Sequence, residues 1–390
     1  MLTRQGWTVL GTGVGTVVLG RIFGMLELYL AGAALVCLVL IAVLSVLLSR
    51  LTMTVAREVR PDRVSAGTES RVDVLAQNRG TRRTPVLLMV DPVSGTRGAR
   101  LMIAPLAPGA SRDVSYRLPT ERRGIVEIGP LRLELSDPFG LALLRIPATE
   151  VTELTVYPRI HRIPPPPHTF GDDPHAGADH PNALSLTGED FYALRPYVIG
   201  DDMRRVHWPS TARHDEIMVR QDELPWQSRT TIVLDTRSST HTDETFEYAV
   251  SAAASVLQAC RACDDLVRLI STDGADSGFS SGKASADSLM EYLAAVRLSA
   301  GGTMTGVFQR LAGSSSGGTL VTVGATRSAA EELAATRAGT AFGNHIHVVA
   351  TTRLPDEVGP LTVLTGPLHS FGDNWTAVVS ALRARRVVPR

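Results

Sequence analysis

An uncharged apolar run near the amino terminus limits the folds open to this chain. Leu28 to Ser49 spans 22 residues without Asp, Glu, Lys or Arg. A helix of that length rises about 30 Å, which matches the hydrocarbon core of a bilayer. A shorter uncharged run, Trp7 to Leu19, precedes it. We therefore predict a transmembrane helical hairpin over residues 1–50, with a single span as the alternative. A cleaved signal peptide is disfavoured because a second apolar run follows at once.

Charges that flank the two apolar runs predict their orientation. Arg4 precedes the first run, and Arg50, Arg57, Arg60 and Arg63 follow the second. The positive-inside rule places arginine-rich flanks in the cytoplasm. We expect an anchor in the plasma (inner) membrane, with both ends and the bulk of the chain in the cytoplasm.

Glycines in the first run are spaced for helix contact. Gly11 and Gly15 are four residues apart, as are Gly20 and Gly24. Residues at this spacing share one face of a helix, and glycine lets a neighbouring helix approach closely. We expect these glycines at the contact between the two helices.

Residues 51–160 carry short runs in which apolar and polar residues partly alternate, separated by Gly, Pro, Asn and Asp. Such runs are typical of an antiparallel, immunoglobulin-like β-sandwich. Within them, Asp137-Pro138-Phe139-Gly140 is interpreted as a turn with a buried aromatic side chain. Residues 161–185 include Pro164 to Pro167 and are predicted to be a solvated, Pro-rich linker.

From residue 229 to residue 390, strand-like and helix-like segments alternate. This alternation predicts a mainly parallel sheet with helices on both faces, a Rossmann-like α/β domain. The whole chain is thus expected to be multidomain. Cys260 and Cys263 lie within a predicted helix and have no second cysteine pair, so we interpret them as ordinary helix residues rather than a redox or zinc motif.

The segment 186–228 interleaves opposite charges with aromatic residues. This pattern favours a folded surface of paired arginines and carboxylates over a solvated tail. We expect Trp208 and Tyr197 to be partly buried and the charged side chains to lie at the rim. The residues predicted to bind a partner or to form structural pairs are Glu189, Arg195, Tyr197, Gly200, Asp201, Asp202, Arg204, Trp208 and Arg213.

Short motifs follow one another through this segment, namely Gly188-Glu189-Asp190-Phe191, Leu194-Arg195-Pro196-Tyr197, Gly200-Asp201-Asp202, Arg204, His207-Trp208 and Thr211-Ala212-Arg213. In these residues the segment resembles the signature of the domain of unknown function 58 family. Members of that family commonly accompany MoxR-type AAA+ ATPases. The resemblance therefore implies a membrane-anchored cytoplasmic scaffold or adaptor that works with such an ATPase in the assembly or maturation of protein complexes.

The carboxy-terminal region resembles a von Willebrand factor type A domain, in which an Asp-x-Ser-x-Ser loop, a distant Thr and a further Asp hold a divalent ion. Asp235, Ser239 and Thr303 match that set. Arg237 stands at the first serine position, and Val323-Gly324 stands where Asp-Gly is usual. Two oxygen ligands are lost and a cation is gained, which disfavours magnesium. We expect a structural Asp235–Arg237 pair, with a weak magnesium site as the alternative and no other cofactor.

Enzyme motifs give no support for catalysis. The sequence contains no nucleophile elbow, no phosphate-binding Walker loop and no zinc-protease His-Glu pattern. The formal net charge is zero, so we expect no nucleic-acid partner. The predicted partners are the lipid bilayer and an AAA+ ATPase, and the oligomeric state stays open. The alternative is a metal-dependent enzyme that uses carboxylates of the signature segment. A metal-dependent adhesion domain is disfavoured by the inward topology and the incomplete ligand set.

Overall fold

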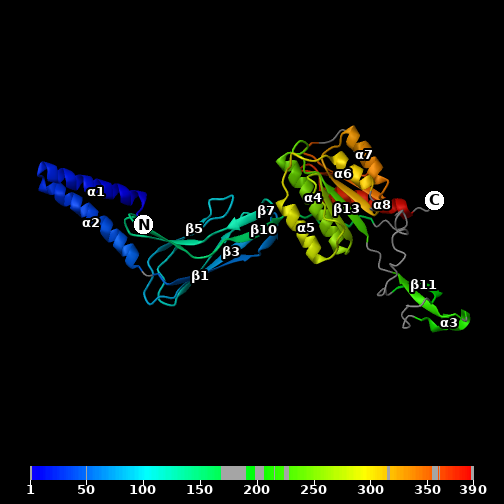
Figure 1. Ribbon diagram of the computed structural model, residues 1–390, viewed down its shortest axis with the longest axis horizontal. Coiled ribbons are helices and arrows are strands. Elements are labelled where there is room, and N and C mark those ends of the chain that lie inside the picture. The colour runs from blue at the N-terminus through cyan, green and yellow to red at the C-terminus, as the bar shows by residue number, and fades with distance from the viewer. Residues whose placement is uncertain are drawn as a thin grey trace. The chain divides into compact units, whose positions relative to one another are not determined.

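The computed structural model describes residues 2–49, 51–167, 190–197, 206–214, 216–223, 228–313, 317–353, 359 and 361–387. The chain divides into two compact units, Met1–Tyr157 and Pro158–Arg390. Figure 1 shows two helices at the start of the first unit, with short strands after them, and a layered α/β arrangement in the second. The multidomain layout expected from the sequence is therefore present.

Two apolar helices open the first unit, α1 (Arg4–Phe23) and α2 (Leu26–Leu48). Thr3 caps α1 by accepting a hydrogen bond from the amide of Gly6, and Gly24 ends it in a left-handed conformation with φ of 67°. Both helices are long and apolar enough to cross a membrane, judged by length and composition. The predicted helical hairpin is thus present as a pair of adjacent helices.

Glycines bring α1 and α2 into close contact. A Cβ added to Gly20 would lie 2.5 Å from the amide nitrogen of Tyr29, and one added to Gly32 would lie 2.6 Å from that of Val17. Gly13 also faces α2, where a Cβ would lie 3.1 Å from Cβ of Leu35. Larger residues at these positions would force the helices apart.

The expectation that the glycines of α1 lie at this contact is confirmed for Gly20 and wrong for Gly11, Gly15 and Gly24, which face open space. Gly13 shares the contact with Gly20, because seven residues make nearly two helical turns and return to the same face. A spacing of four and a spacing of seven both satisfy the helix period, so the sequence did not distinguish them.

Short strands make up the rest of the first unit and form sheets in the orders β1-β3-β6, β2-β10-β7 and β5-β4-β8-β9. Each strand pair in these sheets is antiparallel except β2 with β10, which is parallel. The prediction of antiparallel strands is therefore wrong for the pair β2 and β10. No hairpin links these two strands, so no short turn imposes an antiparallel direction on them. The strands are β1 (Met53–Arg60), β2 (Arg63–Ser65), β3 (Arg71–Asn78), β4 (Leu87–Asp91), β5 (Ala99–Ile103), β6 (Ser111–Arg117), β7 (Gly124–Ile128), β8 (Arg132–Ser136), β9 (Leu143–Pro147) and β10 (Thr152–Tyr157).

Alternate side chains of these strands fill one apolar core. In β3, Val72, Val74 and Ala76 are buried while the residues between them are more exposed. They share a core cluster with Met89 of β4 and Leu133 of β8. The period of two along each strand places one face inward, which is the pattern on which the sequence prediction rested.

The Asp137-Pro138-Phe139-Gly140 segment forms the predicted turn, but its aromatic side chain is exposed. Asp137 is buried and accepts hydrogen bonds from the amides of Phe139, at 2.8 Å, and Ala142, at 2.6 Å. Phe139 is 63% exposed. The prediction of a buried aromatic side chain is therefore wrong. The side chain of this turn that points inward is the hydrogen-bonded carboxylate of Asp137.

The second unit contains a five-stranded sheet in the order β14-β13-β15-β16-β17, and all neighbouring strands are parallel. Figure 1 shows α4 and α5 on one side of the sheet and α6 and α7 on the other. The predicted parallel sheet with covered faces is thus present. Its elements are β13 (Arg229–Leu234), α4 (Asp243–Ala262), β14 (Leu266–Ser271), α5 (Lys283–Ala295), α6 (Met304–Ala312), β15 (Thr319–Gly324), α7 (Ala329–Gly339), β16 (Asn344–Ala350), β17 (Thr362–Thr365) and α8 (Phe371–Val387).

Residues 158–167, which we call the proline strap, pack against this α/β sheet and its helices. Trp375 of α8 donates a hydrogen bond of 2.8 Å from Nε1 to the carbonyl of Pro164. Ser251 of α4 donates one of 2.6 Å to the carbonyl of Arg159. Thr319, at the start of β15, donates one of 3.1 Å to the carbonyl of Pro167, which is buried.

The prediction of a solvated linker is therefore wrong for residues 161–167. Consecutive prolines hold the chain extended and lack amide donors, so their carbonyls stay free to accept hydrogen bonds from surrounding side chains. Residues 168–185 of the predicted linker lie outside the described residues.

Candidate functional site

Asp235 lies at the carboxyl edge of the parallel sheet, directly after β13. Its amide donates a hydrogen bond of 2.8 Å to the carbonyl of Val323 in β15. The chain passes from β13 to β14 on one side and later to β15 on the other, so the strand order reverses at this point. Crevices at such reversals are the usual ligand sites of open α/β sheets.

A buried ion pair occupies this edge. Arg237 donates from Nε to Oδ1 of Asp235 and from Nη2 to Oδ2, each at 2.8 Å. The side chains are 16% and 1% exposed, respectively. A planar guanidinium that meets both carboxylate oxygens has fixed geometry and takes the place that a cation would need. The Asp235–Arg237 pair expected from the sequence is thus present.

A second carboxylate, that of Glu331, also contacts Arg237. Nη1 of Arg237 donates to Oε1 of Glu331 at 2.7 Å. Glu331 also closes a capping box with Ser328 at the start of α7. Thr240 donates a hydrogen bond of 3.0 Å to Oδ2 of Asp235. Sequence reasoning missed Glu331 and Thr240. The Ser-x-x-Glu pattern at residues 328–331 could have located Glu331 at a helix start, but not beside Arg237.

The electrostatics of the cluster favour ionised carboxylates around one cation. Burial by itself would raise the pKa of Asp235, but hydrogen bonds and charge from Arg237 outweigh it and hold that pKa below its usual value. The same balance lowers the pKa of Glu331, where burial is outweighed by the Ser328 amide and Arg237. Hydrogen bonding to Asp235 raises the pKa of Arg237. Burial lowers the pKa of His241, whose Nε2 lies 3.8 Å from Asp235, so it is neutral near pH 7.

The other two residues that match the metal-binding set, Thr303 and Ser239, do not join Asp235 in a metal site. Thr303 caps α6, accepting a hydrogen bond from the amide of Gly306, and Ser239 is exposed. A Cβ on Gly324 would lie 2.9 Å from Cβ of Asp235, which leaves no room for an acidic side chain there. Within the described residues, no three His, Cys, Asp or Glu side chains form a group that could hold a metal ion. The residues at this edge therefore suit internal charge pairing better than magnesium binding.

The signature segment forms a small hairpin of its own. Strand β11 (Asp190–Pro196) pairs antiparallel with β12 (Met218–Glu223), and α3 (Trp208–His214) lies between them in sequence. Val206 and Val219 are buried, and Thr211 accepts a hydrogen bond of 3.0 Å from the amide of Met218. This bond fixes α3 to β12.

The predicted signature residues divide into described and undescribed ones. Arg195 lies in β11 opposite Val219, and the amide of Tyr197 donates to the carbonyl of Ile217 at 2.7 Å. Arg213 is exposed and Tyr197 is half-buried. Glu189, Gly200, Asp201, Asp202 and Arg204 lie outside the described residues, and so do the pairings expected of them.

Trp208 is 64% exposed at the start of α3. The expectation of partial burial is therefore wrong for Trp208, whereas Tyr197 is half-buried as expected. Among the described side chains of this hairpin, Val206 and Val219 take the buried positions instead. An exposed tryptophan is a common feature of binding surfaces.

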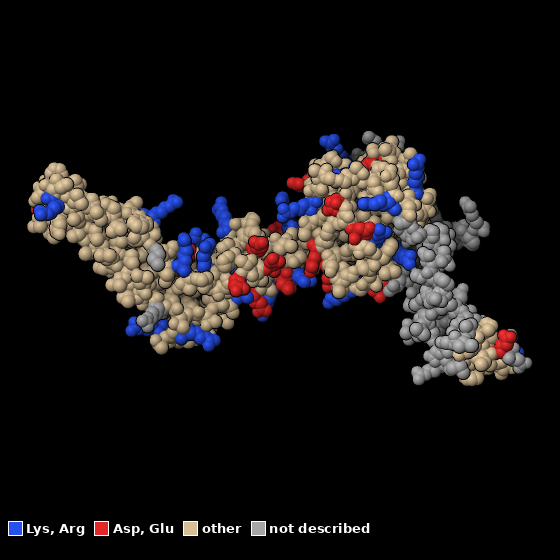
Figure 2. All heavy atoms as spheres, in the orientation of Figure 1, with Lys and Arg blue, Asp and Glu red and all other residues tan. Residues whose placement is uncertain are grey.

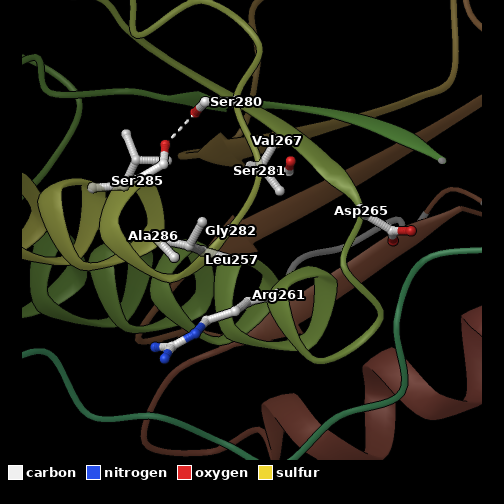
Figure 3. A pocket seen from close by; sticks show the side chains of 10 residues that line it. Leu257, Arg261, Asp265, Val267, Ser280, Ser281, Gly282, Ser285 and Ala286 are labelled. Carbon is white, nitrogen blue, oxygen red and sulfur yellow. Dashed lines mark hydrogen bonds between the residues drawn. The ribbon is translucent and has the colours of Figure 1, made fainter.

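Neither the cysteines nor the small hollow beside α5 offers further chemistry. Cys260 is buried, which raises the pKa of its thiol to about 12, so it stays protonated and unreactive. Cys263 is exposed. Figure 3 shows the hollow, where Ser280 and Ser285 are hydrogen-bonded to each other and Arg261 lies at the border. It holds about one water molecule and no larger ligand.

These features define a class of protein: a multidomain chain with two apolar helices, a strand-rich unit and a parallel α/β unit whose carboxyl edge is closed by an ion pair. Residues 193–315 match a family model described as "Protein of unknown function DUF58". The match supports the resemblance to the domain of unknown function 58 family that the signature residues indicated, over residues 193–315. No curated protein matches it.

Solved structures resemble only parts of the chain. The CARDB domain of a protein from Pyrococcus furiosus is 17% identical, covers 28% of this chain and 93% of its own, and has a TM-score of 0.22. The alkylpurine DNA glycosylase AlkC of Pseudomonas fluorescens is 12% identical and covers 33% of this chain and 39% of its own, with a TM-score of 0.20. Likenesses this slight carry no argument about function.

Proposed function

We propose that this protein is a membrane-anchored cytoplasmic scaffold or adaptor that works with a MoxR-type AAA+ ATPase in the assembly or maturation of protein complexes. The helical hairpin α1–α2 anchors it in the plasma (inner) membrane, with both ends in the cytoplasm. The arginines that flank the apolar runs support this orientation. The ATPase partnership comes from the family that the signature residues indicate.

Two finer fold assignments belong to this proposal. The second unit is a von Willebrand factor type A-like domain, supported by its parallel sheet and by Asp235 at the point where the strand order reverses. The strands of residues 51–160 form an immunoglobulin-like sandwich, supported by their short antiparallel hairpins and shared core.

The observation that carries the proposal is the exposure of Trp208. The side chain of Trp208 is 64% exposed on a short helix, so much of its apolar surface is in contact with water, which is unfavourable. Burial of an indole against a partner recovers that free energy, and for this reason tryptophan dominates many interfaces. The Asp235–Arg237 pair points the same way, because its guanidinium takes the place of a ligand at this edge of the sheet.

A variant pair tests the docking role. Trp208→Ala should leave the melting temperature unchanged, because the side chain is mostly exposed, and should weaken capture of the ATPase by about tenfold or more. Leu368→Ala, 65% exposed in the same unit, is the matched control and should bind like the parent. Equal capture by all three proteins would refute the role of Trp208. Turnover of a small molecule that depends on signature carboxylates would favour a metal-dependent enzyme.

A labelling experiment tests the anchorage and orientation. Cys37 and Cys263 are replaced, and single cysteines are placed at the exposed positions Thr68 and Ser288. A membrane-impermeant thiol reagent should label neither in intact cells and both after lysis. Labelling before lysis would contradict the cytoplasmic orientation.

A further inference from the structure

One end of the strand-rich part of the first unit faces the apolar helices. Strand β1 starts at Met53, shortly after α2, and Met53 pairs with Asn78 at the end of β3. Leu87, at the start of β4, pairs with Ile103 at the end of β5. Residues 79–86, which join β3 to β4, therefore lie at this helix-proximal end.

The loop 79–86 is rigidly built. Asn78 is buried and donates from Nδ2 to the carbonyls of Arg82, at 2.8 Å, and Leu106, at 3.0 Å. Its Oδ1 accepts from the amide of Gly80 at 2.9 Å. Thr84 exchanges two hydrogen bonds with Leu106, one through its amide at 2.9 Å and one through its hydroxyl oxygen at 2.8 Å. The backbone is thus fixed from inside, and its arginines are presented outward.

The charge of this loop is one-sided. Arg79, Arg82 and Arg83 are exposed, and residues 79–86 contain no acid. Across the described part of the chain, no carboxylate forms an ion pair with any of the three. Nearby in β6, Arg112 and Asp113 are both exposed and offset each other. On the face drawn in Figure 2, Lys and Arg gather on the strand-rich part nearest the helices, and Asp and Glu gather farther away.

A second loop at this end is tied to the start of α1. Thr3, the cap of α1, donates from its amide to the carbonyl of Leu141 at 2.9 Å and from its hydroxyl to the carbonyl of Gly140 at 2.6 Å. These bonds hold the exposed Phe139 at the level where α1 begins. Trp7, in the first turns of α1, is 64% exposed. Tryptophan is enriched where a membrane meets water, and the exposed apolar ring of Phe139 lies near the same end of α1.

We propose that the helix-proximal end of the strand-rich part is a docking surface for the anionic headgroups of the bilayer that holds α1 and α2. The inference rests on the proposed membrane anchorage. Arginines beside a membrane span are drawn to anionic lipids, and a guanidinium matches phosphate geometry with two parallel hydrogen bonds. The rigid loop 79–86 supplies these arginines, and Phe139 inserts beside them at the interface. Such contacts fix the strand-rich part against the membrane surface.

Hydrogen exchange on the full chain tests this surface. The protein is placed in nanodiscs of phosphatidylcholine alone or of phosphatidylcholine mixed with phosphatidylglycerol. Amides of residues 79–86 should exchange about threefold more slowly, or slower still, in the anionic discs at low salt, and the difference should vanish at high salt. Equal exchange in both discs, with α1 and α2 protected, would overturn the docking surface. Unprotected α1 and α2 would overturn the membrane anchorage itself.

Charge-neutral variants give a second, independent readout. Arg79→Gln, Arg82→Gln and Arg83→Gln together should remove the difference between the two discs, while an unchanged melting curve shows that the fold persists. The matched control changes three exposed arginines at the far end of the strands to Gln, namely Arg71, Arg117 and Arg122. This control should keep the lipid effect. Loss of the effect in the control, or its persistence in the loop variant, would overturn the assignment to residues 79–86.

Discussion

Arg237 holds both carboxylate oxygens of Asp235, with Nε to Oδ1 and Nη2 to Oδ2 each at 2.8 Å, at the carboxyl end of the central strand β13. The pair lies where a parallel α/β sheet ordinarily keeps its ligand site. Because the cation belongs to the protein itself, the carboxylate is neutralised without a bound ion. The binding surfaces that we propose therefore lie elsewhere, at α3 and at the loop 79–86.

Removal of Arg237 should strongly destabilise the second unit. Arg237→Ala leaves Asp235, 1% exposed, buried without its countercharge, which should cost about 3–5 kcal/mol in the free energy of unfolding. The control is Arg268→Ala, whose pair with Asp276 is more exposed and should contribute less than about 1 kcal/mol. Denaturant titration measures both. An equal decrease in the free energy of unfolding in the two variants would show that the buried Asp235–Arg237 pair contributes no more stability than the exposed pair.

Acid should weaken the second unit through the same cluster. The pKa values of Asp235 and Glu331 are lowered in the folded state from ordinary values of 3.8 and 4.5. Their stabilisation is therefore complete above those ordinary values and is lost as pH falls through the lower, folded values. Unfolding free energies from about pH 6 to about pH 3 should fall more steeply for the parent than for Asp235→Asn. Parallel curves would mean that folding leaves the pKa of Asp235 unchanged, which would contradict this prediction.

Magnesium should not bind tightly at the sheet edge. Arg237 occupies both oxygens of Asp235, and a divalent ion placed there would meet a guanidinium at close range. Calorimetric titration of the full chain with magnesium should give no isotherm in the micromolar range, and chelators should leave the melting temperature unchanged. A one-site isotherm that Asp235→Ala abolishes would contradict this expectation.

The proline strap should contribute measurable stability. Trp375 is fully buried and donates its indole hydrogen bond to Pro164. Trp375→Phe loses that bond and leaves a small void, which should cost about 1–3 kcal/mol and make residues 158–167 easier to cleave. Trp7→Phe, at an exposed position in α1, is the control and should leave the second unit unchanged. Unaltered melting and cleavage in Trp375→Phe would show that the strap is bound loosely.

Local patterns in the sequence predicted the regular elements well. The alternation of strand-like and helix-like segments from residue 229 predicted the elements of the second unit, among them the central strand Arg229–Leu234 and the helix α4. The Asp235–Arg237 pair was predictable because its members are two residues apart, at the end of a buried strand. Each of these inferences needed only neighbours in the chain.

Features that depend on distant contacts were not predictable. Glu331 reaches Arg237 only after two strands and several helices have been placed. The proline strap meets Trp375 across more than two hundred residues, and no local pattern distinguishes it from a free linker. The exposure of Trp208 likewise depends on which side chains fill the β11–β12 hairpin, a matter of packing that charge and aromatic spacing do not determine.

Site-specific crosslinking at Trp208 tests the proposed adaptor role most directly. A photoreactive amino acid is placed at position 208 of the full chain in native membranes, and at the equally exposed position 368 as the control. Position 208 should capture an AAA+ ATPase, and position 368 should not. Crosslinking of the ATPase at neither position, or equally at both, would contradict the adaptor role.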